Sequence, residues 1–167
     1  MSKNKTILLV EDEAIVALNE KLILERSGYA VETAATGEAA VSLIKDGASI
    51  DLILMDIDLG AGIDGTEAAA AILLARDIPI VFLTSHAERE MVERVKGITR
   101  YGYVLKNSGE FVLLESVAMA FELHQAHTRH REAEARYRAL PNEVYRRALE
   151  SAPVLFGISR LADGVYT

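Results

Sequence analysis

Hydrophobic residues along this chain fall into short unbroken runs that alternate with stretches of helical spacing. The runs predict buried strands over residues 6–10, 29–33, 50–56, 80–83 and 101–105. Apolar residues at three- and four-residue spacing, first at Ile15, Leu18, Leu22 and Ile23, predict helices that end at Ser27, span 36–47, 66–76 and 88–96, and begin again near 108. Five strands each followed by a helix imply an α/β fold with a doubly wound, five-stranded parallel sheet.

The polar residues that end these runs are candidate functional residues. In parallel sheets all carboxyl ends lie on one edge, where open α/β folds place their chemistry. Four strands deliver side chains to that edge, namely Glu11 and Asp12, Asp56, Thr84, and Lys106. We therefore expect these five side chains to converge, with Asp56 at their centre.

The chemistry of this set is coherent. Crowded carboxylates repel one another unless a divalent cation or an ammonium neutralises them, and hard oxygen ligands without His or Cys favour Mg²⁺. With both cations present, Asp56 is predicted to act as a nucleophile toward a phosphoryl group and to form an acyl phosphate. Mg²⁺ would take one phosphoryl oxygen, Lys106 a second and the Thr84 hydroxyl a third.

Charge and composition exclude several other classes. Residues 1–121 hold 19 acidic and 11 basic residues, a net charge of −8, whereas residues 122–167 carry a net charge of +1. Binding to nucleic acid is not expected, because phosphate contacts need a basic face. The chain has no cysteine and no apolar run of the ~20 residues that would span a bilayer, so we expect a cytoplasmic segment without membrane contact.

With these residues identified, the chain resembles the receiver domain of two-component response regulators. That family has an acidic pair after strand 1, an acceptor aspartate after strand 3, Thr or Ser after strand 4, and lysine after strand 5 with an aromatic residue three positions earlier. Residues 1–121 match all of it through Glu11, Asp12, Asp56, Thr84, Tyr103 and Lys106. The resemblance implies a (βα)5 flavodoxin-like fold with strand order 2-1-3-4-5.

The resemblance also implies roles. A phosphohistidine on a histidine kinase or phosphotransfer protein would donate the phosphoryl group to Asp56. Asp12 would bind Mg²⁺ directly, Glu11 mainly through water, and the backbone carbonyl of Asp58 would supply another ligand.

A switch is implied as well. Movement of Thr84 toward the phosphoryl group would let Tyr103 turn inward and change the surface of helix 4, strand 5 and helix 5.

Two departures from the family pattern leave local geometry open. Asn107 stands where family members commonly have a proline after the lysine, often with a cis peptide bond before it. The sequence therefore does not decide whether the Lys106–Asn107 bond is cis or trans. The loop after Asp56 is one residue longer than usual.

Other classes of protein share parts of this pattern. The order of Asp56, Asp58, Thr84 and Lys106 also resembles haloacid-dehalogenase-type phosphatases, but their acidic pair follows the lysine. The glycines at 60, 62 and 65 match a dinucleotide fingerprint by letter, although nearby carboxylates would repel a pyrophosphate. An inactive receiver that acts only as an interaction module is a third alternative, and His124, His127 and His130 are a weak candidate metal site.

The sequence after residue 121 predicts two further segments. Residues 122–141 form a helical linker, in which Met119, Leu123, Ala126, His130, Ala133, Tyr137 and Leu140 make a weak coiled-coil seam for a homodimer or for packing on the domain. Residues 142–167 predict a helix and an unfinished hairpin, similar to the entrance of a PAS sensor domain. We therefore expect a truncated piece of a multidomain sensor protein, such as a hybrid histidine kinase, with its catalytic parts beyond Thr167.

Overall fold

The computed structural model describes residues 5–85, 97–98 and 101–139. Five parallel strands form one sheet in the order β2-β1-β3-β4-β5, as predicted. The strands are β1 (Thr6–Val10), β2 (Ala30–Ala34), β3 (Leu52–Asp56), β4 (Ile80–Thr84) and β5 (Tyr103–Leu105). The helices are α1 (Ala14–Arg26), α2 (Gly37–Lys45), α3 (Gly65–Ala75) and α5 (Glu110–Arg138). The α/β fold with a long C-terminal helix is confirmed.

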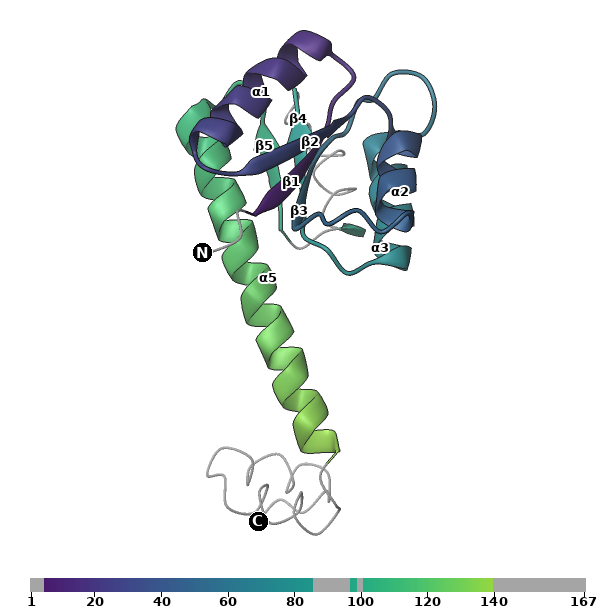
Figure 1. Cartoon of the computed structure of the whole chain (residues 1–167), viewed down its shortest axis with the longest axis vertical. Helices are drawn as coiled ribbons and strands as arrows, with labels where there is room; N and C mark the ends of the chain where they lie inside the picture. Colours follow the sequence, from purple (N-terminus) through teal and green to yellow (C-terminus); the bar gives the residue numbers. More distant parts are fainter. Residues whose placement is uncertain (1–4, 86–96, 99–100, 140–167) are drawn as a thin grey trace, which may run out of the picture. The chain divides into compact units, whose positions relative to one another are not determined.

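The two faces of the sheet are covered by different helices (Figure 1). Side chains alternate along a strand, so Leu8 and Ile53 pack on the α2 and α3 side, while Ile7 and Leu54 pack on the α1 and α5 side. Strands β3 and β4 are buried along their whole length. This explains their continuous apolar sequences, since parallel strands are covered on both faces.

The helix boundaries agree with their sequence signals. Ser27 ends α1, followed by Gly28 at a φ of +91°. The Thr36 side chain accepts a hydrogen bond from the Ala39 amide at the start of α2. Asp64 and Glu67 form a reciprocal capping box at the start of α3.

The inner face of α1 differs from the one suggested by its apolar spacing. Ile15 and Leu18 are 85% and 59% exposed, whereas Leu24 is fully buried and Glu20 is 6% exposed. The helix carries apolar residues all around, so periodicity alone did not identify the side that packs on the sheet.

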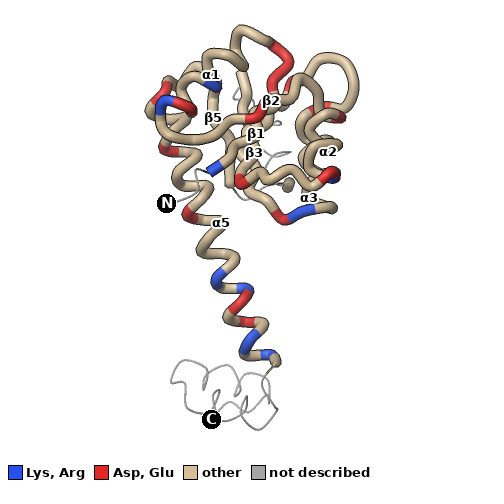
Figure 2. The backbone as a smooth tube through the Cα atoms, in the orientation of Figure 1, with Lys and Arg blue, Asp and Glu red and all other residues tan. Residues whose placement is uncertain are grey.

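Several predicted segments lie outside the described residues: the helix over 88–96, the end of the seam at Leu140, and everything from Pro141 to Thr167. In the part of α5 after His124, acidic and basic residues are interspersed (Figure 2), and nearly every residue is exposed. None of the helices in the described part of the chain is both long and apolar enough to cross a bilayer.

Candidate functional site

The carboxyl edge of the sheet brings together acidic side chains from two strands. Glu11 follows β1 and Asp56 ends β3, and both are 2% exposed. Together with the exposed Asp12 they form a group whose nearest carboxylate oxygens all lie within 4.8 Å of one another. Because β1 and β3 are hydrogen-bonded neighbours, residues 45 positions apart meet here.

Lys106, which follows β5, reaches across β4 into this group. Its Nζ lies 2.6 Å from Oε2 of Glu11 and donates a hydrogen bond to Oδ2 of Asp56 at 2.8 Å. The lysine side chain is 14% exposed, and the two carboxylates are 0% and 3% exposed. One ammonium therefore joins two buried carboxylates of different strands.

Burial and charge act in opposite directions on these groups. Burial raises the pKa of Glu11 and of Asp56 above their ordinary values, and the hydrogen bond from Lys106 only partly offsets this. Burial alone would lower the pKa of Lys106, but its hydrogen bonds to Asp56 and Glu11 outweigh that effect and raise it. The lysine is thus held as a cation, while the carboxylates need positive charge to stay ionised.

Backbone amides orient the two buried carboxylates. The amide of Glu13 donates to Oε1 of Glu11 at 3.2 Å, and the amide of Asp58 donates to Oδ1 of Asp56 at 3.2 Å. Each carboxylate therefore has one oxygen toward a backbone N–H and the other toward Lys106.

The donor set fits a hard divalent cation. Three carboxylate oxygens from Glu11, Asp12 and Asp56 lie close enough to share one ion, and the described part of the chain adds no sulfur or imidazole ligand to them. Asp12 is also packed against the loop after β3, because a Cβ placed on Gly60 would lie 2.9 Å from its Oδ2. Gly60 has a φ of +63°, so this close approach and this backbone conformation both favour glycine.

Gly65 has a structural purpose that the sequence pattern did not reveal. A Cβ at this position would lie 1.8 Å from the backbone oxygen of Asp56, and the Gly65 amide donates to the carbonyl of Ile57 at 3.0 Å. The start of α3 thus packs directly against the end of β3. A glycine in the apparent dinucleotide fingerprint is therefore explained by the close approach of two backbone segments.

The remaining predicted residues are placed as follows. Thr84 ends β4 and is 2% exposed, and its carbonyl accepts from the Lys106 amide at 3.0 Å. Tyr103 is 38% exposed on β5, and the side chain of Asp58 is exposed. The Lys106–Asn107 peptide bond is trans.

The three histidines of α5 do not form a metal site. Nδ1 of His124 is hydrogen-bonded to the Tyr101 hydroxyl at 2.8 Å. Across residues 5–85, 97–98 and 101–139, the acidic group at the sheet edge is the only cluster of three or more candidate ligands.

Comparison with known proteins agrees with this geometry. The family model described as response regulator receiver domain matches residues 7–118. The chain belongs to this family, and it is accordingly a phosphoacceptor signalling module of the two-component type.

Relatives and solved structures give its wider context. Transcriptional regulatory protein PdtaR of Mycobacterium tuberculosis is 32% identical over 117 residues, which cover 70% of this chain and 56% of that protein. Sensor kinase CckA of Brucella abortus is 27% identical over 108 residues, 64% of this chain and 11% of that protein.

Among solved structures, the N-terminal domain of a response regulator/sensory box/GGDEF 3-domain protein from Carboxydothermus hydrogenoformans is 48% identical. The two structures align with a TM-score of 0.70, and the alignment covers 74% of this chain and 99% of the Carboxydothermus chain. The chain spans about half the length, or less, of the curated relatives it matches.

Proposed function

We propose that Asp56 accepts a phosphoryl group from a phosphohistidine on a histidine kinase or phosphotransfer protein. The observation that carries this proposal is the Lys106 ammonium, held 2.8 Å from Asp56 beside an acidic group that suits a divalent cation. Both features bring positive charge to the position where a transferring phosphoryl group would develop negative charge.

The transfer step is a displacement at phosphorus. A carboxylate oxygen of Asp56 attacks the phosphorus, an O–P bond forms, and the N–P bond of the donor breaks. The electron pair of that bond returns to the donor imidazole nitrogen. Lys106 is positioned to contact one phosphoryl oxygen, and the buried Thr84 hydroxyl at the end of β4 is the candidate partner for another. Later attack by water breaks the O–P bond and releases inorganic phosphate.

Glu11, Asp12 and Asp56 are the residues that would hold Mg²⁺, with the backbone carbonyl of Asp58 as a further proposed ligand. When bound, the ion would supply positive charge to a phosphoryl oxygen. The Lys106 ammonium opposes the rise that burial causes in the pKa of Glu11 and of Asp56, and thereby favours the ionised form that a metal ligand needs.

Phosphorylation by a small-molecule donor tests this assignment. The chain is incubated with acetyl phosphate and Mg²⁺, and its intact mass is measured. We expect addition of one phosphoryl group, lost in Asp56→Asn and retained in the matched control Asp46→Asn, whose side chain is exposed at the end of α2. Unmodified wild-type protein would favour an inactive interaction module, and sustained turnover of small phosphoesters would favour a phosphatase.

The output of the site is proposed to be a change in the surface around β5 and α5. A phosphoryl group adds a charge of roughly −1.5 to −2 at the strand edge, which biases a two-state surface. Thr84 and Tyr103 are the candidate switch residues, because one ends β4 beside the site and the other lies partly exposed on the adjacent strand β5.

The chain as a whole is proposed to be the N-terminal part of a larger cytoplasmic sensor protein. Residues 1–121 would be the receiver, 122–141 a helical linker, and 142–167 the start of a PAS-like domain. Support comes from the 48% identical protein, whose name places a sensory box after a response regulator. The match to a sensor kinase is compatible with a hybrid histidine kinase as the parent.

The linker helix is proposed to form a weak homodimer. Met119, Leu123 and Tyr137 of the predicted seam lie on α5 and are 59%, 38% and 56% exposed. Sedimentation equilibrium tests this: Leu123→Glu should shift the chain toward monomer, whereas Gln125→Glu, which lies off the seam, should not. Equal dissociation constants for both variants would contradict a seam-mediated dimer.

A further inference from the structure

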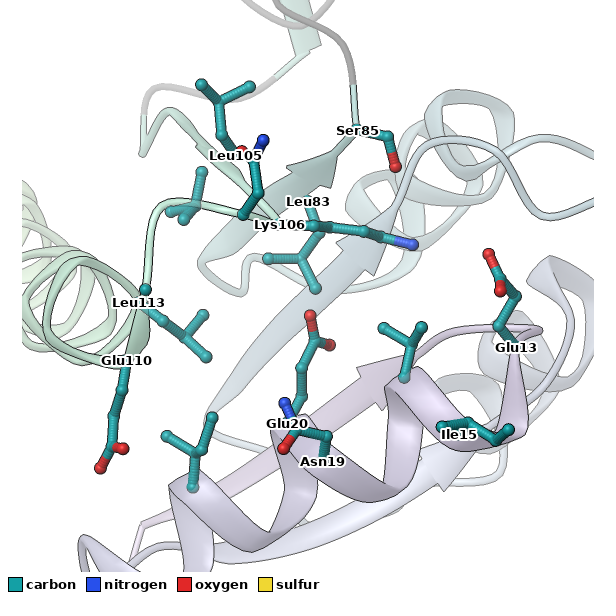
Figure 3. Close-up of a pocket in the computed structure, with 15 residues that line it drawn as sticks. Glu13, Ile15, Asn19, Glu20, Leu83, Ser85, Leu105, Lys106, Glu110 and Leu113 are labelled. Atoms are coloured by element: carbon teal, nitrogen blue, oxygen red, sulfur yellow. The ribbon is translucent and has the colours of Figure 1, made fainter.

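A pocket of about 510 Å³ lies between α1, the ends of β4 and β5, and the start of α5. Its walls are mostly apolar, and Val16 and Ile23 of α1 are among the lining residues. The side chains of Leu83 and Leu113 face α1 across the pocket (Figure 3). This volume lies within the range of about 300–1,000 Å³ that is usual for ligand sites. We call it the α1–α5 pocket.

Glu20 places a buried carboxylate in this pocket. The residue is 6% exposed, and Figure 3 shows its side chain extending from α1 toward Leu83 and Lys106. Among the described residues, Oε2 of Glu20 is a buried side-chain oxygen with neither a hydrogen bond nor an ion pair. The buried Oε2 of Glu11, by contrast, has the Lys106 ammonium at 2.6 Å. Buried polar atoms normally have partners, and an orphan oxygen in a pocket indicates a missing one.

The charges around the pocket favour a cationic partner. Glu13 and Glu110 also line it and are exposed, and Lys106 is the only basic residue among the described residues that line it. That ammonium is already bonded to Asp56 and to Glu11. The carboxyl of Glu20 is therefore not neutralised by a direct partner within the described part of the chain.

The combination of apolar walls with an orphan carboxylate matches a particular side chain. Arginine has an aliphatic stem that packs along apolar surface and a planar guanidinium with five donors. Asn19 and Ser85, which also line the pocket, offer further oxygen acceptors for those donors.

We propose that the α1–α5 pocket receives an arginine side chain from a partner protein, whose guanidinium pairs with Glu20. The occupant is assigned from charge and shape complementarity: an acidic interior, apolar walls and an anion without a cation.

A blocked tripeptide, acetyl-Ala-Arg-Ala-amide, is the probe for this pocket. Methyl NMR of the full chain follows its binding, because the lining residues Val16, Ile23, Leu83 and Leu113 carry methyl groups. We expect methyl shifts confined to these residues and their neighbours, with a dissociation constant on the order of 10 mM for a single side chain. The same peptide with citrulline, a neutral isostere of arginine, should not bind measurably.

The solution conditions must distinguish binding of the peptide at Glu20 from binding at the other carboxylates. Burial raises the pKa of Glu20 to about 7, so the titration is run in alkaline buffer where the carboxylate is ionised. The charges of Glu11, Asp56 and Lys106 also act on the pKa of Glu20, and Glu13 and Glu110 are the other acidic residues that line the pocket. Saturating Mg²⁺ is included to compete at the acidic group on the sheet edge.

Two matched variants decide the outcome. Glu20→Gln should weaken arginine-peptide binding at least about tenfold, because the buried anion is lost. Glu32→Gln removes an exposed carboxylate on β2, outside the pocket, and should leave the affinity unchanged. The proposal is overturned if Glu20→Gln binds like wild type, if the citrulline peptide binds equally well, or if wild type gives no methyl shifts in the pocket.

Discussion

Replacing Lys106 by methionine is the sharpest perturbation of the acidic site. The substitution keeps most of the aliphatic stem and removes the ammonium that lies 2.6 Å from Glu11 and 2.8 Å from Asp56. Two buried carboxylates would then face each other without a cation. Removing one partner of a buried ion pair typically costs about 3–5 kcal/mol of folding stability. We expect Lys106→Met to cost about 3 kcal/mol at pH 8, because the site lies at the edge of the sheet.

The pH dependence has a definite sign. Burial raises the folded-state pKa of Glu11 and Asp56, so their favourable contribution is complete below their unfolded values and is lost as pH rises through the folded ones. Without Lys106 these pKa values rise further. The deficit of Lys106→Met relative to wild type should therefore be largest at pH 8 and shrink toward pH 5, as protons replace the missing ammonium.

Thermal and urea unfolding across this pH range measure the effect. We expect a fall in Tm of about 10 °C at pH 8. Lys45→Met, on the exposed end of α2, is the matched control and should change stability by no more than about 0.5 kcal/mol. If both variants unfold alike at pH 8, or if the Lys106 deficit is independent of pH, the electrostatic account of the site is wrong.

Further predictions concern the loop, the buried acid and the metal. Gly65→Ala should destabilise the fold by about 3 kcal/mol or more in urea unfolding, because its Cβ would lie 1.8 Å from the backbone oxygen of Asp56. Gly97→Ala serves as control, because no atom of the described residues lies within 4 Å of a Cβ placed there. Glu20→Gln should have the same free energy of unfolding as wild type near pH 4.5 and a value roughly 2–3 kcal/mol higher at pH 8.5. Burial raises the pKa of Glu20 to about 7 in the folded state, so wild type loses stability as pH rises through that value and the variant does not. A difference that is constant with pH would contradict this. Asp12→Asn should lower Mg²⁺ affinity at least about tenfold by calorimetry, and unchanged affinity would remove Asp12 from the ligand set.

Topology made the sheet and the position of its polar edge predictable. Strands β1, β3 and β4 are apolar because both of their faces are covered. A polar residue ends β3 or directly follows β1 and β5, so the convergence of Glu11, Asp56 and Lys106 follows from the parallel order of the strands. The exact ion pairs depend on strand register and side-chain reach, which no local pattern contains. The link between Lys106 and Glu11 is one such contact.

The packing of α1 and of the glycine loop was not predictable in the same way. Apolar residues on several sides of α1 gave no unique inner face, and the burial of Glu20 contradicts the usual preference of carboxylates for water. The need for glycine at 65 arises from a backbone approach between β3 and α3, which becomes visible only in three dimensions.

Chemical trapping of the phosphorylated residue is the most direct measurement of the proposed chemistry. After reaction with acetyl phosphate and Mg²⁺, borohydride converts an aspartyl phosphate to homoserine, which peptide mass spectrometry locates in the sequence. We predict homoserine at position 56 and at no other aspartate, and none when Mg²⁺ is chelated. Homoserine at a different aspartate, or equal labelling without Mg²⁺, would contradict the account.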